Sequence, residues 1–135
     1  METAVLRKRV WIYLINTIVY HGIGFAIALP FLLVLKLHIV FYILISLGFA
    51  TILSFVLACL ILKISGGYTF ASALLKVKHV SSDGGKINNR QILILAIFQS
   101  IAIFALFDLI YFLKNQTERG AIDRLSDSFA IDNNL

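Results

Sequence analysis

Three long stretches of the chain are almost entirely apolar, and polar residues gather between and beyond them. The apolar stretches cover residues 10–35, 39–64 and 92–113, with a short connection at 36–38 and a longer polar one at 65–91. A helix rises about 1.5 Å per residue, so each stretch is long enough to cross a hydrocarbon core of about 30 Å. The pattern predicts an all-α membrane protein with about three transmembrane helices, the first two forming an antiparallel hairpin.

The third apolar stretch has a second interpretation, because Gln99 and Ser100 interrupt it near its middle. A continuous helix would carry the chain across the membrane, whereas a break at these residues would turn it back as a re-entrant hairpin. The first arrangement places the C-terminal tail outside the cell, and the second keeps it inside. Both arrangements agree with the pattern.

The polar segments carry weaker signals. Apolar residues recur at helical spacing over 70–77, and residues 77–80 then alternate before a glycine turn. This predicts a short amphipathic helix and a short strand within the connection. In the tail, three apolar residues predict a short interfacial helix: Ile122, Leu125 and Phe129.

Composition and charge support a membrane location. The chain is 60% hydrophobic and 14% charged, against about 45–50% and 25% for a soluble domain. We therefore expect a single membrane domain over residues 1–135. The net charge is +5, and the basic residues lie beside the apolar stretches. This favours contact with anionic lipid head groups and argues against nucleic acid as a partner.

The basic residues are distributed unevenly between the two ends of the predicted helices. Three of them precede the first stretch, at positions 7–9, whereas Lys36 is alone in the first connection. Five more lie in or beside the second connection: Lys63, Lys76, Lys78, Lys86 and Arg90. The positive-inside rule then predicts that the N-terminus and the 65–91 loop are cytoplasmic.

A polar stripe runs along the first predicted helix. Arg9, Tyr13, Asn16 and Tyr20 recur at spacings of four, three and four, so they share one helix face, with His21 at its edge. Such a stripe can line a pathway for an ion or solute. It can also hold helices together through hydrogen bonds, which is the interpretation that we favour.

The second predicted helix has a ridge of small residues, and the third has isolated polar ones. Ser46, Ala50, Ser54 and Ala58 follow strict four-residue spacing, which lets another helix of this chain, a partner subunit or a second copy approach closely. On a continuous third helix, Gln99 and Asp108 would lie on nearly opposite faces. Asp108 is then either an interface residue with a basic neighbour or an ion-binding carboxylate.

The sequence offers little for catalysis. The three histidines lie at different depths without a second ligand at metal spacing, and Cys59 is the single cysteine. Phosphate-binding glycine loops and nucleophile elbows are absent from the sequence. We expect no metal, no cofactor and no enzymatic activity.

Four short motifs resemble the RDD family of bacterial membrane proteins. In that family an arginine begins the first helix and an aspartate follows seven residues later, and here these positions are Arg9 and Asn16. Gly67 and Thr69 look like the family's Gly-x-Thr, followed by Ala71 and Ser72 where Gly-Lys is usual. Arg90 leads into the next helix, and residues 119–128 are similar to the closing motif, with Asp123 as its aspartate.

The resemblance implies a multi-pass protein of the bacterial cell membrane and suggests a part in transport, since some members are proposed sodium/proton antiporters. It also suggests that Arg9 pairs with Asp123, which requires a cytoplasmic tail. From the residues we expect an accessory, assembly or regulatory subunit that binds other membrane subunits or its own copies. One reason is that three helices offer few places to bury four polar residues: Arg9, Asn16, Gln99 and Asp108.

The alternative functions belong to other classes. An ion or small-solute transporter would use His21 and Asp108 as titratable groups. An enzyme at the membrane surface is less favoured and would rest on three aspartates: Asp83, Asp123 and Asp127.

Overall fold

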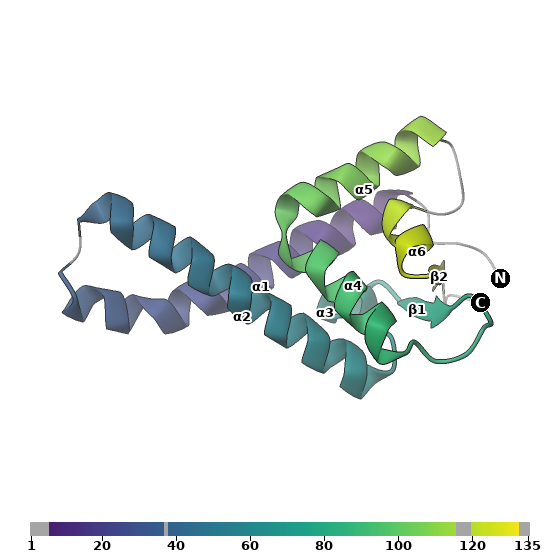
Figure 1. Cartoon of the computed structure of the whole chain (residues 1–135), viewed down its shortest axis with the longest axis horizontal. Coiled ribbons are helices and arrows are strands. Elements are labelled where there is room, and N and C mark those ends of the chain that lie inside the picture. Colours follow the sequence, from purple (N-terminus) through teal and green to yellow (C-terminus); the bar gives the residue numbers. More distant parts are fainter. Residues whose placement is uncertain (1–5, 37, 116–119, 133–135) are drawn as a thin grey trace.

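Two long helices form a hairpin, and the rest of the chain packs around its open end (Figure 1). The computed structural model describes residues 6–36, 38–115 and 120–132. Helix α1 covers Leu6–Val34 and α2 covers Ile39–Ser65. Both are long and apolar enough to span a membrane, with mean hydropathies of 1.9 and 2.5. The prediction of a mainly helical membrane protein with an initial hairpin is confirmed at this level.

The remaining elements are short. Helix α3 covers Phe70–Leu74 and strand β1 covers Val77–Ser81. Helices α4, at Asn89–Ser100, and α5, at Ala102–Asn115, are followed by α6 at Ala121–Leu125 and by strand β2 at Ser128–Asp132. Arg119 of the closing motif lies outside the described residues.

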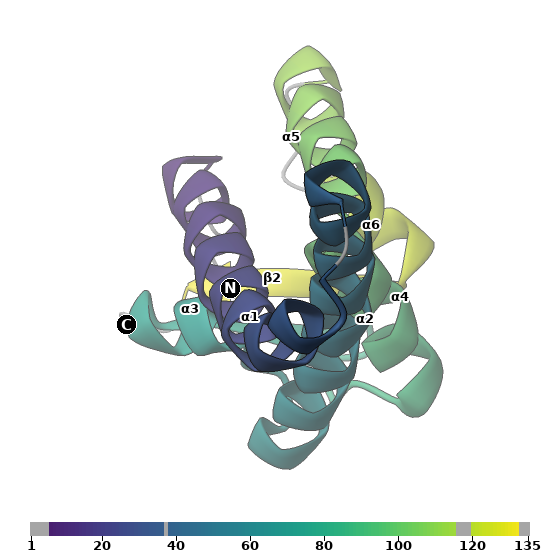
Figure 2. The same cartoon turned by 90° about the vertical axis from the view of Figure 1, so that its left-hand side faces the viewer.

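The third apolar stretch is bent rather than straight. Helices α4 and α5 meet at an angle of 99°, and they leave the bend in different directions (Figure 2). Ile101 between them has extended backbone, with φ −109° and ψ 106°. The Ser100 hydroxyl donates to the carbonyl of Ala96 at 2.6 Å, a bond that often accompanies a bent helix. The structure therefore has the break that the alternative interpretation expected.

The ridge of small residues on α2 is buried within this chain. Ser46, Ala50, Ser54 and Ala58 are all at most 1% exposed. Gly24 of α1 lies so close that a Cβ there would stand 2.5 Å from the Cα of Ala50. The ridge thus packs against helices of the same copy, since its Ala58 end joins a core with α1, α4 and α6 that includes Tyr20, Leu95 and Ile122.

The tail differs from its predicted helix. The helix ends at Leu125, and Asp127 takes a left-handed φ of 51°. The chain then forms β2, which pairs antiparallel with β1 so that His79 stands opposite Ala130. Phe129 therefore lies in a strand. The backbone of this strand is hydrogen-bonded to β1, which lies about 50 residues earlier in the chain. In the connection, α3 ends before Val77, which begins β1.

Candidate functional site

The start of α1 is joined to the tail by a buried ion pair. The Arg9 Nη2 donates to Asp123 Oδ2 at 2.5 Å, and the two side chains are 4% and 0% exposed. The backbone N–H of Gly120 donates to the same oxygen at 3.2 Å. The Arg9 guanidinium also lies 5.0 Å from the ring centre of Phe112 on α5. The contact that the motifs suggested is therefore present.

Asp108 on α5 forms the second buried contact of the stripe. The Tyr13 hydroxyl donates to Asp108 Oδ2 at 2.6 Å, and the N–H of Ile122 donates to Oδ1 at 2.7 Å. Gly120 comes so near this carboxylate that a Cβ would stand 2.5 Å from Oδ1. One carboxylate thus connects α1, α5 and the start of α6, and a side chain at position 120 would displace it.

The next two residues of the stripe bind the start of α3. Asn16 donates from Nδ2 to Thr69 Oγ1 at 3.0 Å and accepts at Oδ1 from the N–H of Ala71 at 3.0 Å. Tyr20 accepts from the N–H of Phe70 at 3.3 Å. Thr69 is the N-cap of α3 and accepts from the N–H of Ser72. The stripe therefore satisfies backbone groups that a helix start leaves unpaired.

Glycine 67 explains the first position of the Gly-x-Thr motif. Its φ is 125°, a conformation that residues with a side chain rarely adopt. A Cβ at this position would lie 2.2 Å from the carbonyl oxygen of His79. The motif therefore allows β1 to pass close to the end of α2, while Thr69 begins α3.

The expectation that Gln99 and Asp108 lie on separate faces is wrong for this fold. The bend at Ile101 turns α5, so that Asp108 bonds Tyr13 while Gln99 lines the same small cavity as Tyr13. The expectation assumed a continuous helix, in which the angular offset of nine residues would hold. Both side chains are at most 2% exposed.

The need for a second copy to bury the polar residues is also not upheld. Arg9, Asn16, Gln99 and Asp108 are all buried within one chain. The short helices and the β1–β2 ribbon supply the cover that three straight helices would lack. Burial of these residues is therefore no longer a reason to expect oligomers.

Other predicted positions lie outside this cluster. His21 is half-buried, and its Nδ1 lies 3.1 Å from the carbonyl of Thr17 on its own helix. Arg90 is exposed in the first turn of α4. Asp83 accepts from the N–H of Gly85 in an exposed turn, which holds the pKa of its carboxyl below the usual range.

The sequence analysis missed His79. It lies on β1, is 6% exposed and shares a cavity with Arg9 and Tyr13. Burial lowers the pKa of His79 to about 4, with a further decrease from the positive charge of Arg9 and a smaller opposing effect from Asp108. One signal was available in the sequence. His79 precedes Val80 in an alternating run, and alternation put His79 on the strand face opposite Lys78.

The fold and this cluster define a class of protein: a helical membrane protein in which buried polar contacts join its first helix to a bent helix pair and to its tail. The model described as the RDD family matches residues 3–127. The chain belongs to the RDD family. It matches no curated protein and no solved structure. Within the described residues, no group of three or more His, Cys, Asp or Glu could hold a metal ion.

Proposed function

We propose that this RDD-family protein is an accessory or assembly subunit of a membrane complex, and that the closed end of its hairpin binds an apolar helix of the partner. One observation carries the proposal. The polar side chains of α1 bond to groups of this chain, whereas the far end of the same hairpin presents an entirely apolar groove. The polar end serves the fold, and the apolar end is available for contact.

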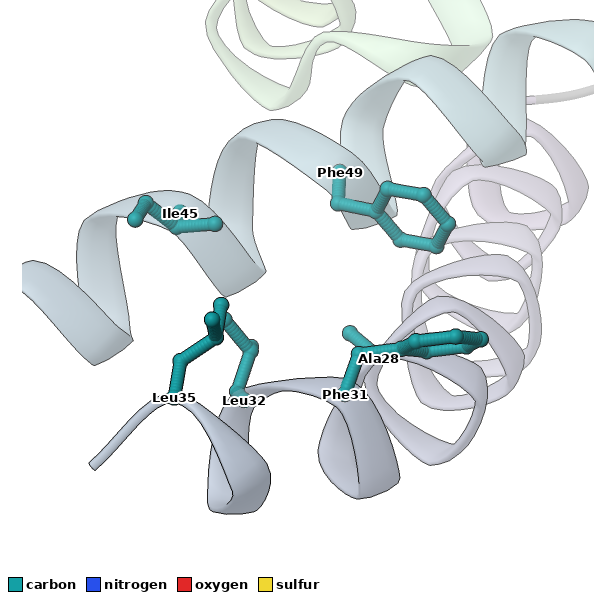
Figure 3. Close-up of a pocket in the computed structure, with 6 residues that line it drawn as sticks. All are labelled: Ala28, Phe31, Leu32, Leu35, Ile45 and Phe49. Carbon is teal, nitrogen blue, oxygen red and sulfur yellow. The ribbon is translucent and has the colours of Figure 1, made fainter. Parts of the chain in front are cut away.

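The groove lies between α1 and α2 near their connection (Figure 3). It has a volume of about 340 Å³. Ala28 and Leu32 are buried at its base, and four more exposed side chains surround them: Phe31, Leu35, Ile45 and Phe49. A hollow with an apolar base and large apolar side chains around it suits the side-chain ridge of another helix.

The size of the polar cavity favours a subunit over a channel. The cavity beside Tyr13 and Gln99 has a volume of about 10 Å³, roughly the space of one water molecule. A solute path would need a wider polar opening between the buried groups. The three aspartates considered for an enzyme are likewise placed in a turn, in the Arg9 pair and on the surface, at positions 83, 123 and 127.

Photo-crosslinking in native membranes tests the groove. A photoreactive phenylalanine analogue replaces Phe31, which lines the groove, or Ile52, which is 66% exposed on α2 and does not line it. The proposal predicts an adduct of discrete protein mass from position 31, and mainly lipid adducts from position 52. The additional change Leu35→Trp, which narrows the groove, should reduce the protein adduct.

The masses of the adducts decide between partners. A heterologous mass supports the accessory role, and twice the mass of this chain would identify a second copy as the occupant. Equal lipid labelling at both positions would contradict the proposal. Size-exclusion profiles of the variants, all purified in one detergent, check that each variant is folded.

The proposed orientation has two crossings and a re-entrant α4–α5 pair. The 65–91 loop, the start of α1 and the tail lie at one end of the molecule (Figure 1). The basic flanks at positions 7–9 and 63–90 lie at this end, which by the positive-inside rule faces the cytoplasm and its anionic head groups. The orientation also allows Arg9 and Asp123 to meet.

Transport is the second candidate, and the bent helix pair favours it. Broken helices near buried carboxylates are common at the ion sites of transporters, and Asp108 lies seven residues after the break. Purified protein in liposomes would then show a sodium- or proton-dependent flux that Asp108→Asn abolishes. The absence of flux from wild-type protein would favour the subunit role, whereas a flux that survives Asp108→Asn would keep transport and exclude Asp108 as its ion site.

A further inference from the structure

A small cavity lies where α1, α4 and the β1–β2 ribbon meet. Its volume is about 10 Å³. Six buried residues surround it: Arg9, Ile12, Tyr13, His79, Gln99 and Ala130. It is distinct from the apolar groove, which lies towards the other end of the hairpin.

Two polar atoms at this cavity have no hydrogen-bond partner within the part of the chain that the structure describes. They are Nδ1 of His79 and Oε1 of Gln99. Their side chains are 6% and 2% exposed, so bulk water does not form hydrogen bonds with these two atoms. A buried polar group without a partner is costly, and proteins usually satisfy such groups with an internal water.

We propose that this cavity is a binding site for one water molecule, which bridges the imidazole of His79 to the side-chain amide of Gln99. A water both donates and accepts hydrogen bonds. It can therefore donate to Oε1 of Gln99 and pair with Nδ1 of His79 in either neutral tautomer. The size of the cavity matches one such molecule.

Charge argues against an ion in the same place. The guanidinium of Arg9 lines the cavity and would repel a cation, and neither Asp108 nor Asp123 is among the lining residues. An anion would meet the unpaired carbonyl oxygen of Gln99, and Arg9 is already paired with Asp123. A neutral molecule that donates and accepts fits the site best.

The bridge would add a second polar contact between α4 and β1, because the first turn of α4 already bonds β1 from Gln91 Nε2 to Ser81 Oγ at 3.0 Å. Gln99 lies two residues before Ile101, where the α4–α5 pair bends, and His79 lies on the ribbon. The water would thus hold the last turn of α4 against β1. Loss of either side chain should free the other and loosen the contact.

Water-edited solid-state NMR of the labelled full chain in lipid bilayers tests the site. Magnetisation transferred from water should reach the imidazole of His79 and the amide of Gln99 at short mixing times, although both are buried. Ser54 is the control, because it is equally buried but its hydroxyl donates to the carbonyl of Thr51 at 2.9 Å. Transfer to Ser54 should be absent under the same conditions.

A variant distinguishes a bridging water from general hydration. Gln99→Leu removes one anchor and should abolish the transfer to His79, while the spectrum of α2 is unchanged. If His79 and Gln99 of the wild-type protein receive no more magnetisation from water than Ser54 does, the proposal is overturned without any variant. Shifts of both signals on adding potassium or bromide would also overturn it, in favour of a cation or anion.

Discussion

The two ends of the α1–α2 hairpin are built on opposite principles. At the open end, Arg9, Tyr13 and Asn16 reach across to other elements and bond to carboxylates, a hydroxyl and backbone N–H groups. At the closed end, the residues between the helices are apolar, and a groove of about 340 Å³ remains between them. One helix therefore serves two purposes along its length.

The difference shows what the polar stripe does. In an apolar environment, an unpaired polar group is expensive, and each polar residue of α1 that lies in the stripe has a partner within the chain. The stripe thereby determines which short elements pack against α1 and in what order. The groove has no such partner, so its contacts are left to lipid or to another helix.

The largest expected effect comes from breaking the Arg9–Asp123 pair. Arg9→Met or Asp123→Leu alone leaves a buried charge without its partner, which should cost about 3–5 kcal/mol. The unfolding midpoint in detergent should fall, and the protein should become polydisperse. The double variant removes both charges of the pair and should be more stable than either single one. Single variants with the same unfolding midpoint as the wild type would contradict the buried ion pair at the open end.

A pH titration should show the burial of His79. In the unfolded chain its pKa is about 6.5, and in the folded protein it is about 4, so between these values the unfolded state binds more protons. Stability should therefore decrease as the pH falls through this window, by about 3 kcal/mol at about 1.4 kcal/mol per pH unit.

The control for this titration is His79→Gln, which removes the titrating group. The loss of stability between pH 6.5 and 4 should be smaller in this variant, as read from thermal unfolding at a series of pH values. Parallel curves for the two proteins would show that His79 is accessible to protons in the folded state.

Close packing of the hairpin can be tested at two glycines of α1. Gly24→Ala would place a Cβ 2.5 Å from Ala50 and should cost about 1–3 kcal/mol through overpacking. Gly22→Ala is the matched control, because no atom lies within 4 Å of its added Cβ and alanine favours a helix. Equal thermal stability of the two variants would contradict the close approach of α1 and α2.

The smallest effect is expected at Asn16. In Asn16→Asp, the side chain can still accept from the N–H of Ala71, and the Thr69 hydroxyl can turn to donate, so the aspartate keeps both contacts and should be less destabilising than leucine. Asn16→Leu leaves the N–H of Ala71 without a partner and should cost about 1–3 kcal/mol. Unfolding midpoints at neutral pH compare the two, and an aspartate as disruptive as leucine would contradict these bonds.

Local patterns in the sequence predicted the elements whose signal is local. The apolar stretches predicted α1 and α2, and the spacing of Arg9, Tyr13, Asn16 and Tyr20 placed them on one face. The partners of that face could not be derived in the same way. Strand β2 depends on pairing with β1, which is about 50 residues away in the chain, and a pattern of three apolar residues predicted a helix there instead.

The bend had the largest consequence for the site. It lies at Ile101, which has extended backbone and directly follows Gln99 and Ser100, the residues at which the sequence allowed a break. Once the chain turns there, Asp108 bonds Tyr13 and Gln99 lines the same cavity as Tyr13, whereas a straight helix would put the two on nearly opposite faces. The Arg9–Asp123 contact was suggested by the family motifs and not by spacing, because 114 residues separate the two.

The side of the membrane on which the tail lies tests the central claim most directly, because the polar contacts of the open end need Arg9 and Asp123 on the same side. A fluorescent protein that matures only in the cytoplasm, or alkaline phosphatase that is active only outside, can be fused after residue 135. We predict fluorescence and no phosphatase activity. Active phosphatase without fluorescence would mean three full crossings, and it would contradict the Arg9–Asp123 pair and the account built on it.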